Sequence, residues 1–370
     1  MSTTINHTST QEHHLRTKTT PSQPLALEER TNHLGYKFVS STVNIVGVSV
    51  KEGQQLTGVE KTPSLFRKGG LLKGITNLGW EINDLGDLTK ESLQDDIDEQ
   101  EEMDGSQYKY VLPKIEILGC MNNRLSQITK KSSSEGNMMV TLGGDHGLAS
   151  GSIHGLLQTY PDLKVIWVDA HGDCNIPETS PSGNYHGMPA AHILGWIPQG
   201  TMKSFDWLKG NLLKPENIVF IGLRDLDEGE KKLLNDHNIK VYTPYDIEDK
   251  GGIGTVMNEA LAYLKADSDQ DCPIHISWDV DGCDPGFIKA TGTMARCGIT
   301  ERESHYILRR VARTGNLVSL DMVEVNAALG EGGFAEQREV FHGDNKLLVG
   351  NSTLVYAMEF ILSALGDRWL

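Results

Sequence analysis

The chain has 370 residues, 38% of them hydrophobic, which is enough for one large α/β domain or two ordinary ones. Its formal net charge of −16 argues against nucleic acid and anionic membrane surfaces as partners, because both are negatively charged. The chain contains no apolar run of about 18 residues, so no membrane-spanning helix is expected. Five cysteines without a Cys-x-x-Cys pair favour a reduced, cytoplasmic location.

The first 40 residues differ in composition from the rest. They are rich in Ser and Thr and poor in large apolar side chains, so burial cannot offset their ordering entropy. A disordered N-terminal tail is therefore expected over 1–40. The first eleven residues lack acids, and Arg16 and Lys18 follow, so a mitochondrial transit peptide is the alternative interpretation.

From residue 41 to residue 370 the pattern predicts a single folded domain. Apolar runs predict strands at 43–50, 137–146, 163–171, 217–225, 239–247, 274–282 and 317–326. Apolar residues at helical spacing predict helices at 63–75, 252–264 and 352–365. Several strands are apolar at consecutive positions, as in strands covered on both faces. The expected fold is a three-layer α/β sandwich, with a central, mostly parallel sheet flanked by helices.

An acidic surface insertion is expected over 91–106. Residues 91–104 contain eight acids and no Lys or Arg. This charge pattern predicts a solvated loop rather than a packed element.

Four of the predicted strands end in polar side chains. The motifs are GGDH, which ends at His146; DAHGD, with Asp169, His171 and Asp173; SWDVDGCDP, with Asp279 and Asp281; and LDMVEVN, with Glu324. Ligands gather beyond the carboxyl ends of parallel strands, and side chains two apart in an extended chain share a face. Each motif alone has an ordinary explanation as a turn, a helix cap or a solvated acid. Together, two histidines and four aspartates from three strand ends indicate a metal site.

This set of side chains also favours particular metals. Four carboxylates and two imidazoles without a thiolate suit manganese better than a structural zinc. Six ligands exceed the needs of one tetrahedral ion, whereas two ions about 3.5–4 Å apart would use them all. Four aspartates also balance the charge of two divalent ions.

The motifs GGDH, DAHGDCN and SWDVDGCDP resemble the three metal motifs of the ureohydrolases and, within them, of the arginase family. The resemblance runs from about Val43 to the last predicted helix, and the segment 53–71 is also similar to arginases. It implies an arginase-like fold and manganese-dependent hydrolysis of L-arginine to L-ornithine and urea.

The resemblance implies six ligands for two Mn²⁺ ions, namely His146, Asp169, His171, Asp173, Asp279 and Asp281. Asp169 and Asp279 would bridge both ions. His146 and Asp173 would complete the more buried site, and the two remaining ligands would complete the other.

The chemistry explains why such groups are needed. A guanidinium has a pKa above about 12 and resists neutral water, whereas metal binding lowers the pKa of water to about 7 and gives hydroxide. The resemblance assigns Glu324 to binding of the guanidinium and Asp173 to protonation of the departing amine. It also assigns His186, in SGNYHG, to proton shuttling; a plain loop histidine is the alternative.

The loops favour an α-amino acid as substrate. By resemblance, Asn175, Ser182 and Asn184 hold the α-carboxylate, and Asp227 and Glu230 lie near the α-amino group. Neutral donors for a carboxylate and acids for an ammonium suit such a substrate. Thr293, in ATGT, matches a further active-site position.

Four residues depart from the usual arginase pattern: Gly147, Met294, Cys297 and Ala327, where Ser, Pro, Gly and Pro are common. None is a ligand, so they affect loop geometry rather than reaction class. The resemblance also implies a homotrimer, with Arg302 and Glu303 at positions used in the interface; an exposed charged pair is the alternative.

Three other functions remain open at this point. One is hydrolysis of agmatine or another guanidino compound. Another is a metal-poor pseudoenzyme that binds arginine. The third is a single-zinc deacetylase of the same architecture, which would not need the second histidine and the fourth aspartate.

Overall fold

The protein was analysed as a computed structural model, which describes residues 32–330, 338–342, 345–349 and 352–366. Within these residues, eight strands form one parallel sheet in the order β2-β1-β3-β8-β7-β4-β5-β6. The strands are β1 (Thr42–Val48), β2 (Glu81–Leu88), β3 (Met138–Gly143), β4 (Lys164–Val168), β5 (Ile218–Ile221), β6 (Lys240–Tyr242), β7 (Ile274–Asp279) and β8 (Leu317–Val323). Two further strands, β9 (Arg338–His342) and β10 (Asn345–Val349), pair in antiparallel fashion.

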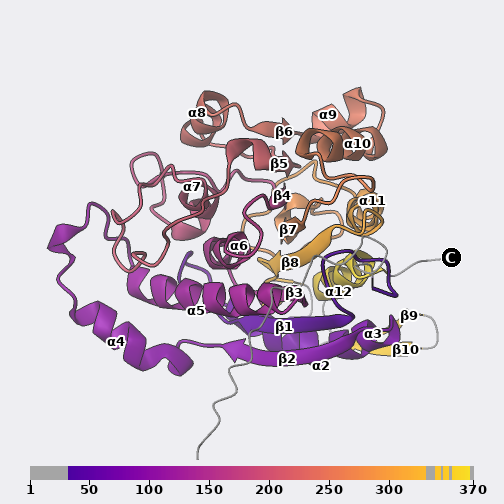
Figure 1. Ribbon diagram of the computed structural model, residues 1–370, viewed down its shortest axis with the longest axis horizontal. Helices are drawn as coiled ribbons and strands as arrows, with labels where there is room; N and C mark the ends of the chain where they lie inside the picture. The colour runs from indigo at the N-terminus through magenta and orange to yellow at the C-terminus, as the bar shows by residue number, and fades with distance from the viewer. Residues whose placement is uncertain (1–31, 331–337, 343–344, 350–351, 367–370) are drawn as a thin grey trace, which may run out of the picture.

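Helices cover both faces of the sheet. They are α2 (Thr62–Lys68), α3 (Leu71–Asn77), α4 (Gln94–Glu102), α5 (Ile115–Ser134), α6 (Ala149–Leu157), α7 (Pro189–Ile193), α8 (Glu228–Asp236), α9 (Pro244–Asp249), α10 (Ile253–Leu264), α11 (Glu301–Ala312) and α12 (Ser352–Ala364). Figure 1 shows α5 and α6 along one face and α10, α11 and α12 along the other. The expected three-layer α/β sandwich is confirmed.

The seven predicted strands are all present. In six of them consecutive residues are buried, as in strands covered on both faces of a sheet. The seventh, β6, is a three-residue edge strand in which only Tyr242 is buried. β2 was missed: its sequence EINDLGDL is polar and largely exposed, and it pairs only with β1 at the sheet edge. Arg67 of α2 holds this strand through Asp84, at 2.7 Å, and through Asp87. The hairpin of β9 and β10 was also not predicted.

The predicted helix over 63–75 is divided into α2 and α3. Gly70 lies between them with a φ of 91°, in the left-handed region that glycine adopts without steric cost. Helices α10 and α12 match their predicted ranges closely.

The predicted tail was too long at its inner end. Residues 1–31 lie outside the described residues, but 32–40 pack against the body of the protein. Tyr36 is buried, its hydroxyl donates to the carbonyl of Ala364 at 2.7 Å, and its ring centroid lies 5.1 Å from that of Trp80. This contact spans 328 residues of sequence, so local composition could not reveal it.

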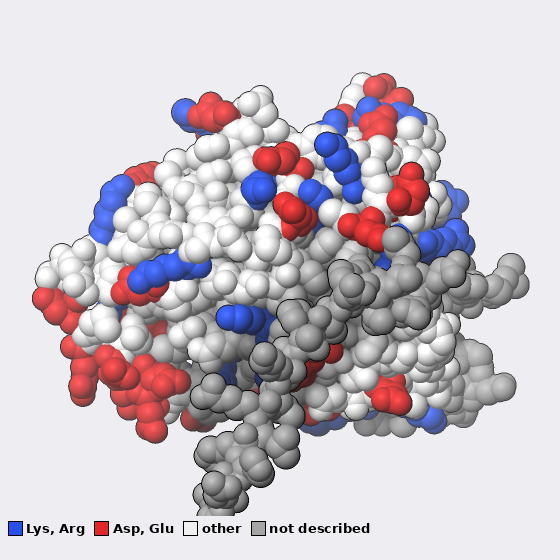
Figure 2. Space-filling model, viewed as in Figure 1, with Lys and Arg blue, Asp and Glu red and all other residues white. Residues whose placement is uncertain are grey.

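The acidic insertion forms a helix, so the expected loop was wrong. Leu93 and Ile97 are buried, and α4 packs along α5 through this apolar side. The acids point to solvent, and Figure 2 shows them as a red patch at the lower left. Leu93, just before α4, and Ile97, within it, are thus the buried apolar residues that join this acidic segment to the core.

None of the helices that the structure describes has the length and hydropathy needed to cross a bilayer. At the centre of the sheet, β3, β8, β7 and β4 are consecutive neighbours and run parallel. The four polar motifs at their carboxyl ends are therefore brought to one edge.

Candidate metal centre

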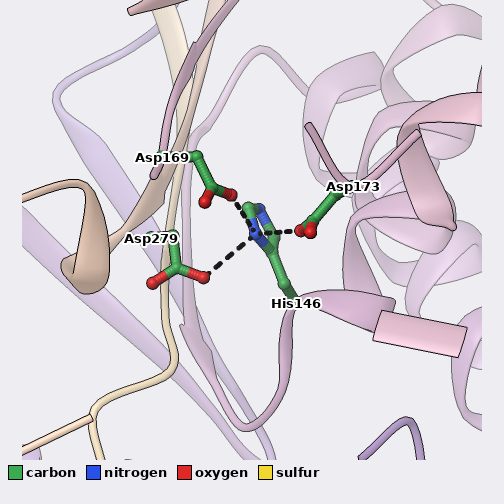
Figure 3. Close-up of side chains that lie close together, drawn as sticks. All are labelled: His146, Asp169, Asp173 and Asp279. Carbon is green, nitrogen blue, oxygen red and sulfur yellow. Dashed lines mark ion pairs between the residues drawn. The ribbon is translucent and has the colours of Figure 1, made fainter. Parts of the chain in front are cut away.

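A buried histidine lies among three aspartates beyond the central strands. Nδ1 of His146 lies 3.1 Å from Oδ2 of Asp169, 2.8 Å from Oδ2 of Asp173 and 3.3 Å from Oδ2 of Asp279. Figure 3 shows the three carboxylates around the imidazole ring, two of them from the loop after β4 and one from the end of β7. All potential ligand atoms in this group lie within 4.8 Å of one another, so one cation could contact all four.

A second group adjoins the first. Nδ1 of His171 lies 3.4 Å from Oδ1 of Asp169 and 3.2 Å from Oδ2 of Asp281. Asp169 belongs to both groups, as a bridging ligand must. Asp279 belongs to the first group alone, and its Oδ1 accepts the backbone N–H of Asp281 at 2.8 Å. The structure thus brings together all six predicted ligands.

The residues fit a pair of divalent cations. Nδ1 of His146 is buried and makes no hydrogen bond within the described residues, although three carboxylate oxygens surround it. Buried polar atoms are nearly always satisfied, so this atom indicates a missing partner. The neighbouring donors are carboxylate oxygens and imidazole nitrogens, which suit a hard or borderline divalent ion.

The pKa values show how strongly these charges interact. Burial alone would lower the pKa of His146, but Asp169, Asp173 and Asp279 raise it well above its usual value. Burial raises the pKa of Asp279, and the carboxylates of Asp281 and Asp169 raise it further. A concentration of buried negative charge is costly without a compensating cation.

Three residues that the sequence analysis missed hold the ligands in place. Nε1 of Trp167 donates to Oδ2 of Asp169 at 3.0 Å, and Oγ of Ser277 lies 2.8 Å from Nε2 of His146. Each precedes an aspartate ligand by two residues, so the alternation of a strand could have revealed both. The third, Asp145, accepts the backbone N–H groups of Gly53 and Gly147 at 2.8 and 2.9 Å.

Glu324 and His186 lie together beside this centre. Oε1 of Glu324 accepts the backbone N–H of His146 at 2.9 Å and lies 3.1 Å from Nδ1 of His186. Burial opposes the charged imidazole, but the carboxylate outweighs it and raises the pKa of His186 to about 9. Asp173 and Glu324 both have positive φ, 46° and 60°, an unusual conformation for residues with a side chain.

A cleft of about 130 Å³ opens over the centre. Its lining includes His171, Asp173, Asn175, Ser182, His186, Asp227, Glu230, Asp279, Asp281 and Thr293. Five of the predicted substrate contacts are therefore on its wall. Asn184 is not among the lining residues; its backbone N–H donates to Oγ of Ser182 at 3.2 Å. Glu324 lies behind the wall, in contact with His186.

Two of the predicted substrate residues also cap a helix. The side chain of Asp227 accepts the backbone N–H of Glu230 at 2.9 Å, and that of Glu230 accepts the backbone N–H of Asp227 at 3.3 Å. This capping box begins α8. Thr293 donates to Oδ2 of the ligand Asp281 at 2.8 Å.

The structure gives two of the sequence departures a physical meaning. A Cβ at Gly147 would lie 2.8 Å from Oδ1 of Asp145, so the turn fits closely around a glycine. Cys297 has a φ of 64°, a conformation that favours the Gly usual at this position. Met294 is exposed and Ala327 is buried.

Fold and site together define a three-layer α/β protein with a carboxylate-rich metal centre beyond its strand ends. The model of the Arginase family matches residues 41–363. An arginase of Plasmodium berghei is 40% identical over 352 residues, covering 91% of this chain and 97% of that protein. The chain belongs to the Arginase family, which confirms the resemblance seen in the motifs.

Comparison with solved structures also identifies arginases as similar to this chain. The arginase of Bacillus subtilis superposes with a TM-score of 0.72 at 34% identity, covering 89% of this chain and all of that one. An Entamoeba histolytica arginase in complex with L-ornithine has a TM-score of 0.70 at 27% identity, covering 88% and 99%. The family is metal-dependent and its members are hydrolases, which agrees with the buried His and Asp groups.

Replacement of Asp279 by Asn should separate metal binding from stability. The metal-free variant should be at least as stable as the native protein, because one buried like charge is removed. Manganese at 100 times its dissociation constant should stabilise the native protein by about 2.7 kcal/mol, and the variant far less. Thermal unfolding with manganese or with a chelator measures both effects. Asp162→Asn, at an exposed carboxylate, is the control, and equal stabilisation of Asp279→Asn would contradict this assignment.

Glu230 should make the metal-free protein less stable as pH rises. Burial and the carboxylates of Asp173 and Asp227 raise the pKa of Glu230 from 4.5 to about 8. The folded state therefore retains this proton between these pH values while the unfolded state has lost it, and the free energy of unfolding falls as pH increases.

Glu230→Gln should remove this part of the pH dependence and keep the capping box. Its stability relative to the native protein should rise from pH 4.5 to pH 8 in denaturant titrations. Glu228→Gln, at an exposed position of the same helix, should follow the native curve. If the difference in free energy of unfolding between Glu230→Gln and the native protein is the same at every pH, the Glu230 carboxyl does not cause the pH dependence.

Proposed function

We propose that the protein is an arginase that hydrolyses L-arginine to L-ornithine and urea at a centre of two Mn²⁺ ions. The observation that carries this proposal is the joining of two His/Asp groups through Asp169, beneath a cleft lined by acidic and amide side chains. Curated relatives named arginase are 37–41% identical over most of the chain. The relative from Entamoeba histolytica was solved with L-ornithine, the expected product.

His146, Asp169, Asp173 and Asp279 would hold one ion, and Asp169, His171 and Asp281 would hold the other. When bound, such ions lower the pKa of water to about 7 and so supply a nucleophile at neutral pH. The manganese assignment is supported by the absence of thiolates from both groups, as far as the described residues go.

The protein's own residues orient the guanidinium and transfer protons. Glu324 is buried beside His186 and is assigned to the substrate cation, which it would orient over the centre. Attack of water at the guanidinium carbon gives a tetrahedral species, and cleavage of one C–N bond leaves urea. Asp173, in the cleft wall, would protonate the departing amine. His186, which lies in the cleft wall 3.1 Å from Glu324, would carry protons to and from solvent.

The other end of the cleft would recognise the α-amino acid group. Asn175, Ser182 and Asn184 are assigned to the carboxylate, and Asp227 and Glu230 to the ammonium. Nδ2 of Asn175 donates to Oδ2 of Asp227 at 2.7 Å, so the two halves of this recognition site are already connected. Thr293 would hold Asp281 at the edge of the cleft.

We further propose that residues 41–370 are a single catalytic domain, that the protein is cytoplasmic, and that it forms a homotrimer. The family match over 41–363 and five free cysteines support the first two proposals. At the start of α11, Arg302 is exposed, and Glu303 caps the helix by accepting from Thr300 at 2.8 Å. Sedimentation at a mass other than three chains of 40.8 kDa would disprove the trimer.

Urea release from L-arginine and from agmatine, with manganese or with a chelator, tests the function. Manganese-dependent release of urea is expected. The kcat/KM for arginine should be at least about 100-fold higher than that for agmatine, because agmatine lacks the carboxylate that the amide groups would bind. A preference for agmatine would favour the alternative ureohydrolase. Absence of both bound metal and urea release would favour an arginine-binding pseudoenzyme. Hydrolysis of an amide with one bound zinc ion would favour a deacetylase.

Asp227→Asn should separate substrate binding from helix capping. Asn still accepts the N–H of Glu230, so α8 should persist, whereas the charge that faces the ammonium is lost. KM for arginine should rise about tenfold or more, with metal content and thermal stability nearly unchanged. Asp236→Asn, at the other end of α8, is the control. An unchanged KM would remove Asp227 from the recognition site.

A further inference from the structure

A short segment after the acidic helix reaches the loops around the cleft. Residues 103–112 leave α4, run along the left of Figure 1 toward the loops around α7, and return to α5. The backbone N–H of Tyr110 donates to the carbonyl of Thr201 at 2.9 Å, and its carbonyl accepts from Lys203 at 3.0 Å. These bonds form a parallel bridge to Met202, so the segment is fixed where Tyr110 lies.

Tyr110 and Lys109 both bind Glu178. The hydroxyl of Tyr110 donates to Oε1 of Glu178, and Nζ of Lys109 donates to the same oxygen at 2.6 Å. The side chains of the ion pair are 60% and 45% exposed, so that pair contributes little. Tyr110 is buried, and a hydroxyl that donates to an ionised carboxylate makes a strong bond. Tyr110 is thus the main anchor of Glu178.

Glu178 belongs to a tight turn that begins at Asn175. The backbone N–H groups of Thr179 and Ser180 donate to the carbonyl of Ile176, both at 3.0 Å. Oγ1 of Thr179 donates to Oδ1 of Asn175 at 2.8 Å and accepts from the backbone N–H of Ile176 at 3.1 Å. Movement of Glu178 would therefore be transmitted directly to the Asn175 amide.

The amide of Asn175 has one donor left for a ligand. Its Oδ1 is taken by Thr179, and one Nδ2 hydrogen is donated to Asp227. An amide nitrogen carries two hydrogens, so the second can meet a carboxylate in the cleft that Asn175 lines. The direction of this hydrogen depends on the turn that Glu178 anchors.

We propose that Tyr110 and Glu178 are positioning residues, which hold the turn 175–180 so that the Asn175 amide is directed at the α-carboxylate of the substrate. This inference rests on the proposed function. Neither residue is among those that line the cleft, so both act through Asn175. A preorganised turn lowers the ordering cost of binding, and an effect on binding alone changes KM rather than kcat.

The test compares four variants in the manganese-loaded full-length protein. Tyr110→Phe removes only the hydroxyl that donates to Glu178, and Glu178→Ala removes the carboxylate that accepts this hydrogen bond. Glu178→Gln keeps an acceptor oxygen and is the conservative variant. Tyr108→Phe is the matched control, because its hydroxyl lies in the same segment but binds Asp206 at 2.5 Å. Steady-state kinetics with arginine and calorimetric binding of L-ornithine are measured for each.

Tyr110→Phe and Glu178→Ala should raise KM for arginine and Kd for ornithine about five- to tenfold, with kcat within twofold. For Glu178→Gln, KM and Kd should stay within about threefold of the native values. For Tyr108→Phe, both constants should equal the native values. Unchanged KM and Kd in the first two variants would overturn the inference, as would an equal effect of Tyr108→Phe. A native protein that releases no urea would instead refute the proposed function, and ornithine binding would still test the turn.

Discussion

The structure depends on the concentration of negative charge at one edge of the sheet. Asp169, Asp173, Asp279 and Asp281 are all buried there, around the imidazoles of His146 and His171. Such a cluster needs cations, and it also needs a rigid support that prevents the carboxylates from moving apart. Four adjacent parallel strands supply that support, because each contributes its end to the same edge.

The two halves of the site are built differently. The metal centre lies directly on strand ends and is further fixed by Trp167 and Ser277 from within the sheet. The half proposed to recognise the substrate lies on loops, and its order comes from side chains such as Asn175 and Thr179 that bind one another. Chemistry that must be constant thus rests on the sheet, whereas specificity rests on segments that can vary between relatives.

The central sheet and the grouping of the six candidate ligands could be predicted because their signals are local. Buried strands are apolar at consecutive positions, and ligands two residues apart must share a face. The remaining features depend on distant partners. β2 is ordered by β1 and Arg67, α4 by two apolar residues against α5, and Tyr36 by the last helix. The capping role of Asp227 was visible as Asp-x-x-Glu before an amphipathic run, but it was read only as a substrate contact.

The position of β8 has a consequence for how the protein matures. β8 is the last of the eight described sheet strands along the chain, yet it inserts between β3 and β7 and pairs with both. His146 follows β3 and Asp279 ends β7, so β8 lies between the two strands that carry these ligands. All six candidate ligands precede β8 in the chain, so a nascent chain that ends before Leu317 contains every one of them but lacks the strand that lies between β3 and β7.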